Sequence, residues 1–252
     1  MDGYMINKAH IFIQARLTST RFPSKVIQDI DGLPSIVFQY QRVKRSNLAS
    51  EVVVIIPDDK ENNTLAETLE DYSIPYFRGH PEILIRRFED AARFYKSEII
   101  VRTNGDCPLI SSSSIDATIS TFTSETKVDY CSTTLDTSFP VGEHCEAFSY
   151  SALLKGFDLF EISKEIAEHV TPLFYRNPEF FNCLSVPCAH VFPEKLRLCV
   201  DYPEDLHFIR SLLLQLPNKG DSDLIEIINT VRDSPNLLDI NSHYQKDRAL
   251  LS

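Results

Sequence analysis

AHIFIQA at residues 9–15, SIVFQYQRVKRS at residues 35–46 and EVVVII at residues 51–56 follow one another along the chain, and this succession decides the fold. The first and last runs are short, apolar and rich in β-branched residues, which is typical of buried strands. The middle run places its main apolar side chains on one face of a helix: Ile36, Val37, Tyr40 and Val43. Strand, helix and strand form the βαβ unit, which predicts an α/β fold with a mainly parallel sheet.

The alternation continues with helices at 64–72 and 81–96 and with strands at 75–77 and 98–102. From 128 to 148 the chain shows short strand-like pieces broken by Pro140 and Gly142, and helices follow at 151–159 and 164–175. We interpret residues 128–190 as an antiparallel insertion that leaves the sheet, to which a strand at 196–200 returns before helices at 203–216 and 223–231. No linker or repeat marks a boundary, so we expect one domain over residues 1–252.

Charge and glycine content exclude several classes of protein. The chain of 252 residues has 25 Lys and Arg against 36 Asp and Glu, a net charge of −11, which argues against a nucleic-acid binder with a basic surface. With only seven glycines, it contains neither the G-x-x-x-x-G-K-[ST] phosphate loop nor the G-x-G-x-x-G dinucleotide turn. Any phosphate site must therefore use another device.

The sequence also indicates the compartment. Residues 1–9 lack an apolar stretch long enough for a signal peptide, and no run approaches the roughly 20 apolar residues of a membrane helix. The six cysteines form no C-x-x-C pair, so we expect reduced, buried thiols. These features predict a cytoplasmic protein with no membrane partner.

Ligands of parallel sheets bind beyond the carboxyl ends of the strands, so the segments after strands carry the candidate site residues. RLTSTRFPSK follows the first strand and combines Arg16, Arg21 and Lys25 with hydroxyl side chains, which suits a triphosphate as well as it suits a solvated basic loop. Asp106 ends the strand at 98–102 and is suited to magnesium, although Gly-Asp is also a common turn. Asp201 follows the strand at 196–200, where a helix N-cap is the alternative.

IQARLTSTRFPSK, RGHPEILIRRF, VRTNGDCPLI, EAFSYSAL, EHVTPLFY and LCVDYPEDL occur in this order between residue 10 and about residue 210. Together they resemble successive blocks of the cytidylyltransferases that activate acidic sugars, especially the SpsF-like branch, which is related to the 3-deoxy-manno-octulosonate and acylneuraminate enzymes. The resemblance implies a Rossmann-like nucleotidyltransferase fold of the GT-A-like type, a three-layer sandwich. It also implies CTP and an acidic sugar as substrates, Mg²⁺ as cofactor and a homodimer formed through the insertion.

The resemblance further implies roles for individual residues. The nucleotide contacts would be Gln14, Ala15, Arg16, Ser19, Arg21, Lys25, Arg78, Arg87 and Asn104. For Arg78 and Arg87 a structural ion pair is the alternative, and Asn104 either contacts the ribose or shapes the turn. Asp106 and Asp201 would be the magnesium ligands, and together with Arg16 and Lys25 they are the expected catalytic residues.

His144, Glu146, Glu168 and His169 would form or support the sugar pocket. Structural roles are the alternative for Glu168 and His169. Two departures from the family pattern stand out: Ser24 takes the place of a glycine common in the first loop, and His144 replaces a common Asp. The second departure leaves the identity of the sugar open.

The expected reaction is attack of a sugar hydroxyl on the α-phosphorus of CTP, which releases pyrophosphate and leaves a CMP-sugar for surface polysaccharide biosynthesis. Two alternatives remain at this point. One keeps CTP but has a phosphonate, phosphate or other sugar as acceptor, and the other is a GT-A-like glycosyltransferase that uses a nucleotide sugar.

Overall fold

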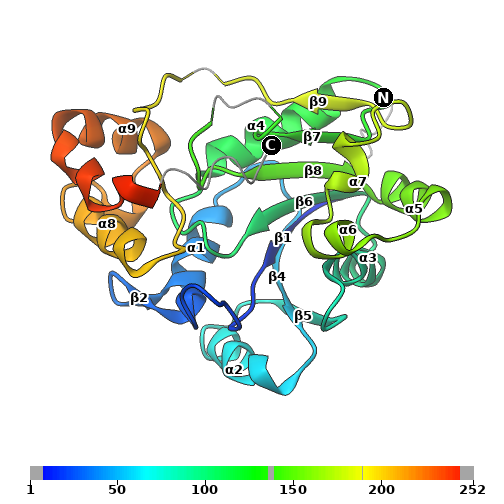
Figure 1. Ribbon diagram of the computed structural model, residues 1–252, viewed down its shortest axis with the longest axis horizontal. Helices are drawn as coiled ribbons and strands as arrows, with labels where there is room; N and C mark the ends of the chain where they lie inside the picture. The colour runs from blue at the N-terminus through cyan, green and yellow to red at the C-terminus, as the bar shows by residue number, and fades with distance from the viewer. Residues whose placement is uncertain (1–7, 136–138, 189, 245–252) are drawn as a thin grey trace, which may run out of the picture.

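The computed structural model describes residues 8–135, 139–188 and 190–244. Its centre is a seven-stranded sheet in the order β5-β4-β1-β6-β8-β7-β9 (Figure 1). The strands are β1 (Ala9–Gln14), β4 (Glu51–Pro57), β5 (Tyr76–Gly79), β6 (Ile99–Asn104), β7 (Tyr130–Ser132), β8 (Cys145–Ser149) and β9 (Cys183–Ser185). β8 runs antiparallel to both neighbours, whereas the other neighbouring pairs are parallel. The predicted fold class is therefore confirmed.

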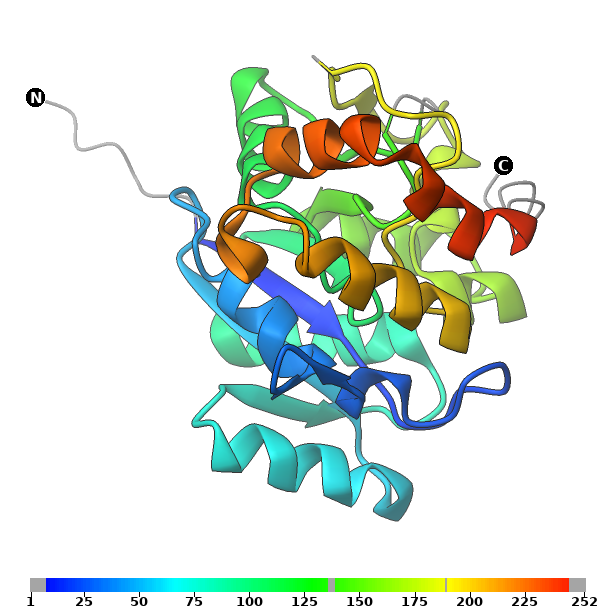
Figure 2. The same ribbon diagram turned by 90° about the vertical axis from the view of Figure 1, so that its left-hand side faces the viewer.

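Helices cover both faces of the sheet and make three layers (Figures 1 and 2). Alternate residues of β1 explain the layers, because Ile11 and Ile13 belong to one apolar cluster and Phe12 to another. The first cluster includes side chains of α1 (Ser35–Val43), α2 (Asn63–Asp71) and α4 (Ser112–Ser124). The second includes side chains of α3 (Leu84–Tyr95), α5 (Tyr150–Leu159) and α7 (Pro172–Tyr175), and α6 (Lys164–His169) packs on α3.

The C-terminal elements form a third apolar cluster beside α1. It contains α8 (Pro203–Leu213), α9 (Leu224–Asp233) and the 3-10 helix η4 (Pro235–Ile240), which lie together in Figure 1. A small hairpin of β2 (Asp29–Ile30) and β3 (Leu33–Pro34) follows the 3-10 helix η1 (Lys25–Ile27) and lies against α8. Two further 3-10 helices are η2 (Lys60–Asn62) and η3 (Lys219–Asp221).

The strand predicted at 196–200 is wrong. This segment makes a single bridge between Arg197 and Val141, and the backbone N–H of Val200 donates to the carbonyl oxygen of Asp106 at 2.7 Å. The position beside β6 is taken by β8, so the segment can pair only with loop residues at the end of the sheet. The insertion likewise does not leave the sheet, because β7, β8 and β9 extend it.

Helix boundaries differ at several points. The helix predicted at 164–175 is broken into α6 and α7 at Val170, whose φ of 66° and ψ of −66° form a γ-turn. The Thr171 N–H closes this turn by donating to the His169 carbonyl oxygen at 2.8 Å. The helix predicted at 81–96 starts only at Leu84, after an extended Ile83. α4 was not predicted, since its serine-rich sequence carries a weak apolar period, and it begins where the Ser111 side chain accepts the N–H of Ser114.

The cysteines of the described residues are all free. Four are buried as expected, whereas Cys183 and Cys188 are half-buried. In the insertion, Phe139 and Phe148 are buried in the core, and Val141 and Tyr150 are partly buried and pack against it. Among the described helices, none has the length and apolar character needed to cross a bilayer. The signal-peptide expectation concerns residues 1–9, of which 1–7 lie outside the described part.

Candidate active site

A cleft of about 510 Å³ lies at the carboxyl ends of β1 and β6. Most of the predicted site residues line it: Gln14, Ala15, Arg16, Ser19, Arg21, Lys25, Arg87, Asn104, Asp106, Glu168 and His169. The lining also includes Pro81 and Glu82, which precede α3, and Leu84, its first residue, and none of these three was predicted. The sheet topology therefore brings the predicted nucleotide contacts other than Arg78 together with Asp106 and two of the four sugar-side residues. Asp201 is not among the lining residues and reaches the site through its contact with Lys25.

Neighbouring strands explain why the first two loops meet. Gln14 and Asn104 are register partners at the ends of β1 and β6, and the Gly105 N–H donates to the Gln14 carbonyl oxygen at 2.8 Å. A Cβ at Gly105 would lie 2.8 Å from that same oxygen, so no larger residue fits without a shift. Glycine thus lets the loop that carries Asp106 approach the loop that carries the cations.

The basic loop after β1 is held at both ends. Leu17 N–H donates to the Asn62 side chain at 2.8 Å, and Ser24 N–H donates to the Leu17 carbonyl oxygen at 3.0 Å. Ser24 has a φ of 57°, in the left-handed region where glycine is at ease. The serine that departs from the family pattern therefore keeps the backbone conformation that glycine permits, and Lys25 follows it directly.

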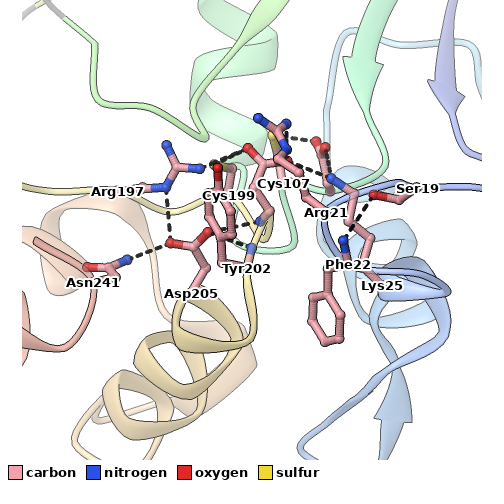
Figure 3. Close-up of polar contacts among 12 residues, drawn as sticks. Ser19, Arg21, Phe22, Lys25, Cys107, Arg197, Cys199, Tyr202, Asp205 and Asn241 are labelled. Carbon is pink, nitrogen blue, oxygen red and sulfur yellow. Dashed lines mark hydrogen bonds and ion pairs between the residues drawn. The ribbon is translucent and has the colours of Figure 1, made fainter. Parts of the chain in front are cut away.

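Lys25 joins the two predicted metal carboxylates. Its Nζ lies 2.6 Å from Asp106 Oδ2 and 2.8 Å from Asp201 Oδ1, and Arg21 Nη2 also lies 2.8 Å from Asp201 Oδ1 (Figure 3). Burial alone would raise the pKa of Asp201, yet Lys25, Arg21 and Arg197 hold it below its usual value. Burial would lower the pKa of Lys25, but the two carboxylates raise it above its usual value, so the ammonium stays charged.

A layer of side chains behind Asp201 fixes its carboxylate. Arg197 is buried and donates to Asp201 Oδ2 at 2.8 Å and to Asp205 Oδ1 at 3.0 Å (Figure 3). Asp205 is also buried, and its Oδ2 accepts the backbone N–H groups of Asp201 and Tyr202 at 2.9 and 3.1 Å. Asn241 donates to Asp205 Oδ1 at 3.0 Å, so the end of the chain supports the site.

Two thiols lie behind the carboxylates. Cys107 Sγ donates to Asp106 Oδ1 at 3.6 Å, and Cys199 Sγ donates to Asp201 Oδ2 at 3.7 Å. Burial raises the pKa of both thiols well above the usual value, so they stay protonated and act as donors. One oxygen of each carboxylate therefore accepts from a thiol, and the other oxygen contacts Lys25.

The donor set fits magnesium that arrives with phosphate. Among the residues that the structure describes, no group of three His, Cys, Asp or Glu side chains could hold a metal ion by itself. Magnesium, however, is commonly held by one or two carboxylates plus substrate phosphates. Asp106 and Asp201 meet that requirement, because both contact one cation, the Lys25 ammonium.

A family model described as "Cytidylyltransferase" matches residues 10–224, which carry the basic loop, both carboxylates and the cleft walls. The chain belongs to the cytidylyltransferase family. It is a CTP-dependent nucleotidyltransferase.

Relatives of this cytidylyltransferase agree with that assignment. It is 25% identical over 235 residues to the spore coat polysaccharide biosynthesis protein SpsF of Bacillus subtilis, covering 91% of this chain and 96% of that protein. It is 36% identical over 128 residues to the 3-deoxy-manno-octulosonate cytidylyltransferase of Chlorobium phaeobacteroides, covering half of each chain. A solved cytidylyltransferase structure from Leptospira borgpetersenii superposes with a TM-score of 0.85 at 28% identity, covering 92% of this chain and 96% of the other.

The two predicted nucleotide arginines after β4 differ in position. Arg87 is buried in the cleft wall, where its Nε and Nη2 donate to the carbonyl oxygens of His80 and Pro81 at 3.0 and 2.9 Å. Burial, with the nearby charge of Arg16, lowers the pKa of Arg87 to about 10. Arg78 is not in the cleft wall, and its guanidinium contacts Asp58 instead, at 3.1 Å. The structural alternative thus describes Arg78 better.

The other two sugar-side residues do not line the cleft. Glu146 is buried, ion-paired with Arg102, and accepts the Tyr130 hydroxyl at 2.6 Å. Arg102 also donates to Gln14 Oε1 at 2.9 Å, which ties this pair to the nucleotide side. His144 is half-buried and does not line the cleft, and burial lowers its pKa.

Arg102, Arg197, Cys107, Cys199 and Asp205 are the functional supports that the sequence did not reveal. The sequence signal for them was position alone, since each stands within five residues of Asp106 or Asp201. Asp205 caps α8, and its ion pair with Arg197 gives it a second role.

Proposed function

We propose that this cytidylyltransferase transfers CMP from CTP to the hydroxyl of an acidic 2-keto-3-deoxy sugar, for surface polysaccharide biosynthesis. The observation that carries the proposal is that Lys25, in a cleft lined with further cations, contacts both Asp106 and Asp201. The names of the relatives, an octulosonate cytidylyltransferase and a spore coat polysaccharide protein, support the choice of acceptor class.

In the proposed reaction, the anomeric oxygen of the sugar forms a bond to the α-phosphorus, and the bond to the β-phosphate oxygen breaks. Pyrophosphate leaves with the electron pair, and the hydroxyl proton passes to solvent. Negative charge builds up on phosphate oxygens, so the task of the protein is positioning and charge stabilisation. Arg16, Arg21, Lys25 and Arg87 supply the positive charge, since all four line the cleft.

Asp106 and Asp201 would hold magnesium. When bound with CTP, the ion would supply charge to the phosphate oxygens and lower the pKa of a coordinated hydroxyl. Arg197 and Cys199 contact Oδ2 of Asp201, which leaves Oδ1 toward Lys25. Glu168 and His169 of α6 line the cleft and would contact the sugar.

A panel of acceptors with pyrophosphate detection tests the acceptor class. We expect pyrophosphate release from CTP with octulosonate or nonulosonate sugars, and little with phosphonates, phosphate esters or neutral sugars. If pyrophosphate were released only with one of these other acceptors, that acceptor would be the substrate and the proposed acidic sugar would be wrong.

Asp106→Asn tests the site. We expect a loss of at least about 100-fold in kcat, with a smaller change in CTP binding, because the carboxylate acts on charge that develops in the transition state. Asp90→Asn is the matched control, since Asp90 pairs only with Arg93 on α3 among the described residues and lies outside the cleft wall. If Asp106→Asn turned over at the wild-type rate, Asp106 would have no role in the reaction.

The oligomeric state and compartment expected from the sequence stay predictions. Light scattering on the purified protein distinguishes a homodimer from a monomer. Fractionation of cells that produce the protein tests the cytoplasmic location.

A further inference from the structure

The Lys25 side chain occupies the position between Asp106 and Asp201 where the proposed metal would bind. Lys25 Nζ lies within hydrogen-bond distance of one oxygen of Asp106 and one oxygen of Asp201. The Lys25 side chain is 11% exposed, so the ammonium takes most of its partners from the protein. It carries positive charge to the place where Asp106 and Asp201 would hold magnesium.

Lys25 differs in this respect from the other cations at Asp201. Arg197 contacts the far oxygen, Oδ2, and is fixed by its second ion pair with Asp205. Arg21 contacts Oδ1, but its side chain is 45% exposed and its guanidinium lies 5.5 Å from the centre of the Tyr202 ring. Of the cations in the described residues, Lys25 alone pairs with both carboxylates.

Displacing Lys25 has different consequences with and without nucleotide. A divalent cation that bound alone would remove both partners of a largely buried ammonium, and an unpaired buried charge is strongly unfavourable. A triphosphate in the same cleft would offer the ammonium new oxygen partners. Exchange of one cation for the other is therefore favourable only when the phosphates arrive as well.

We propose that Lys25 is a tethered counter-ion that excludes divalent cations from the free enzyme, so that the metal binds only together with CTP. This inference rests on the proposed function, because it takes Asp106 and Asp201 as the metal ligands. It adds an order of binding: nucleotide draws Lys25 from the carboxylates, and the metal takes the place that the ammonium leaves.

Titration of the free proteins with Mn²⁺, followed by electron paramagnetic resonance, tests the proposal. Mn²⁺ is a suitable probe because it shares the oxygen ligands of Mg²⁺. Without nucleotide, we expect Lys25→Met to bind Mn²⁺ at least about tenfold more tightly than the wild type. The double variant Lys25→Met/Asp106→Asn should lose that gain, which would locate the new binding at the carboxylates.

Two matched variants separate charge from size and position. Lys25→Arg keeps a cation and should continue to exclude Mn²⁺. Lys219→Met removes a lysine that pairs with Asp31 outside the cleft wall, and it should leave Mn²⁺ binding unchanged. Equal Mn²⁺ affinity of the wild type and Lys25→Met would overturn the proposal. So would tight binding by Lys25→Arg.

A folding failure of Lys25→Met does not remove the test. In that case the wild type alone decides: Mn²⁺ binding without nucleotide that is abolished in Asp106→Asn overturns the proposal, and binding that requires CTP supports it. The proposed function fails separately, through the absence of pyrophosphate release from CTP with every acceptor of the panel.

Discussion

Glu146 is a buried carboxylate whose two oxygens contact Arg102 and the Tyr130 hydroxyl. Glu146→Gln keeps the shape but leaves the buried Arg102 charge without its counter-ion. We expect a loss of about 3 kcal/mol in the free energy of unfolding, since breaking a buried pair strands a charge. Urea denaturation followed by circular dichroism measures it, because the chain has no Trp.

The exposed pair between Arg176 and Glu165 provides the control. Glu165→Gln should change the free energy of unfolding by no more than about 0.5 kcal/mol. Equal losses in the two variants would mean that the Arg102–Glu146 pair contributes no more than a surface ion pair.

Two histidines predict a pH dependence of stability. Burial lowers the pKa of both His10 and His144 below the ordinary value of 6.5. As the pH falls below 6.5, the unfolded chain therefore takes up protons before the folded one, and the free energy of unfolding decreases. Their stabilising contribution is fully present above 6.5 and declines as the pH approaches the lowered values.

We expect the wild type to lose stability between about pH 7.5 and about pH 5.5, and His10→Gln/His144→Gln to lose much less. Urea denaturation at the two pH values measures the difference. The same loss in both proteins would show that other groups dominate this pH range.

At the scale of elements, Gly142 controls how the loop before β8 meets the segment 196–200. Its φ is 105°, and a Cβ there would lie 2.5 Å from the Leu198 carbonyl carbon. Gly142→Ala should cost at least about 2 kcal/mol, because backbone strain and a backbone clash add. Chemical denaturation again measures the effect.

A substitution at Gly32 is the control that distinguishes backbone strain from a steric clash. Its φ is 84°, but a Cβ there would meet nothing within 4 Å. Gly32→Ala should cost only about 1 kcal/mol, from the left-handed backbone alone. A Gly142→Ala cost equal to that of Gly32→Ala would show that the loop can move away from Leu198.

The sequence predicted the strands that are marked by an apolar run within a few consecutive residues. β1, β4 and β6 appear as predicted to within two residues, because a buried parallel strand is apolar along its whole length. Segment 196–200 has the same local pattern and is buried, yet it pairs with loop residues, because β8 occupies the position beside β6. Local sequence shows that a segment is buried and extended, but it does not show which neighbour it has.

The same limit applies to the site. Arg16, Lys25 and Asp106 follow strands and could be located from the order of elements and the family resemblance. Arg102 and Arg197 could not, because an arginine within an apolar run gives no sign of the carboxylate that will face it. Their partners, Glu146 and Asp205, become neighbours only through the sheet and the start of α8.

For the whole molecule, the net charge and the local charge near the cleft have opposite signs. The net charge is −11, but residues 3–50 hold seven cations and two acids, a local balance of +5. Solution at physiological salt screens charges beyond about 8 Å, so a bound triphosphate interacts mainly with the cations of the cleft.

We therefore expect the Kd for CTP to rise as the salt concentration is raised from about 50 mM to about 500 mM, because screening weakens the local attraction. Isothermal titration calorimetry measures it. A Kd that falls over this range would mean that repulsion by the acidic remainder of the molecule outweighs the basic loop.

The contact of Lys25 with both carboxylates also has a consequence for the order in which the molecule is made. Lys25 is separated by 81 residues from Asp106 and by 176 residues from Asp201. Contacts over such spans close large loops, which costs chain entropy. During synthesis the ribosome must release most of the chain before the second carboxylate reaches its partner. A nascent or truncated product that stops before residue 201 contains the strands and the basic loop, but it lacks Asp201, one of the two proposed metal ligands.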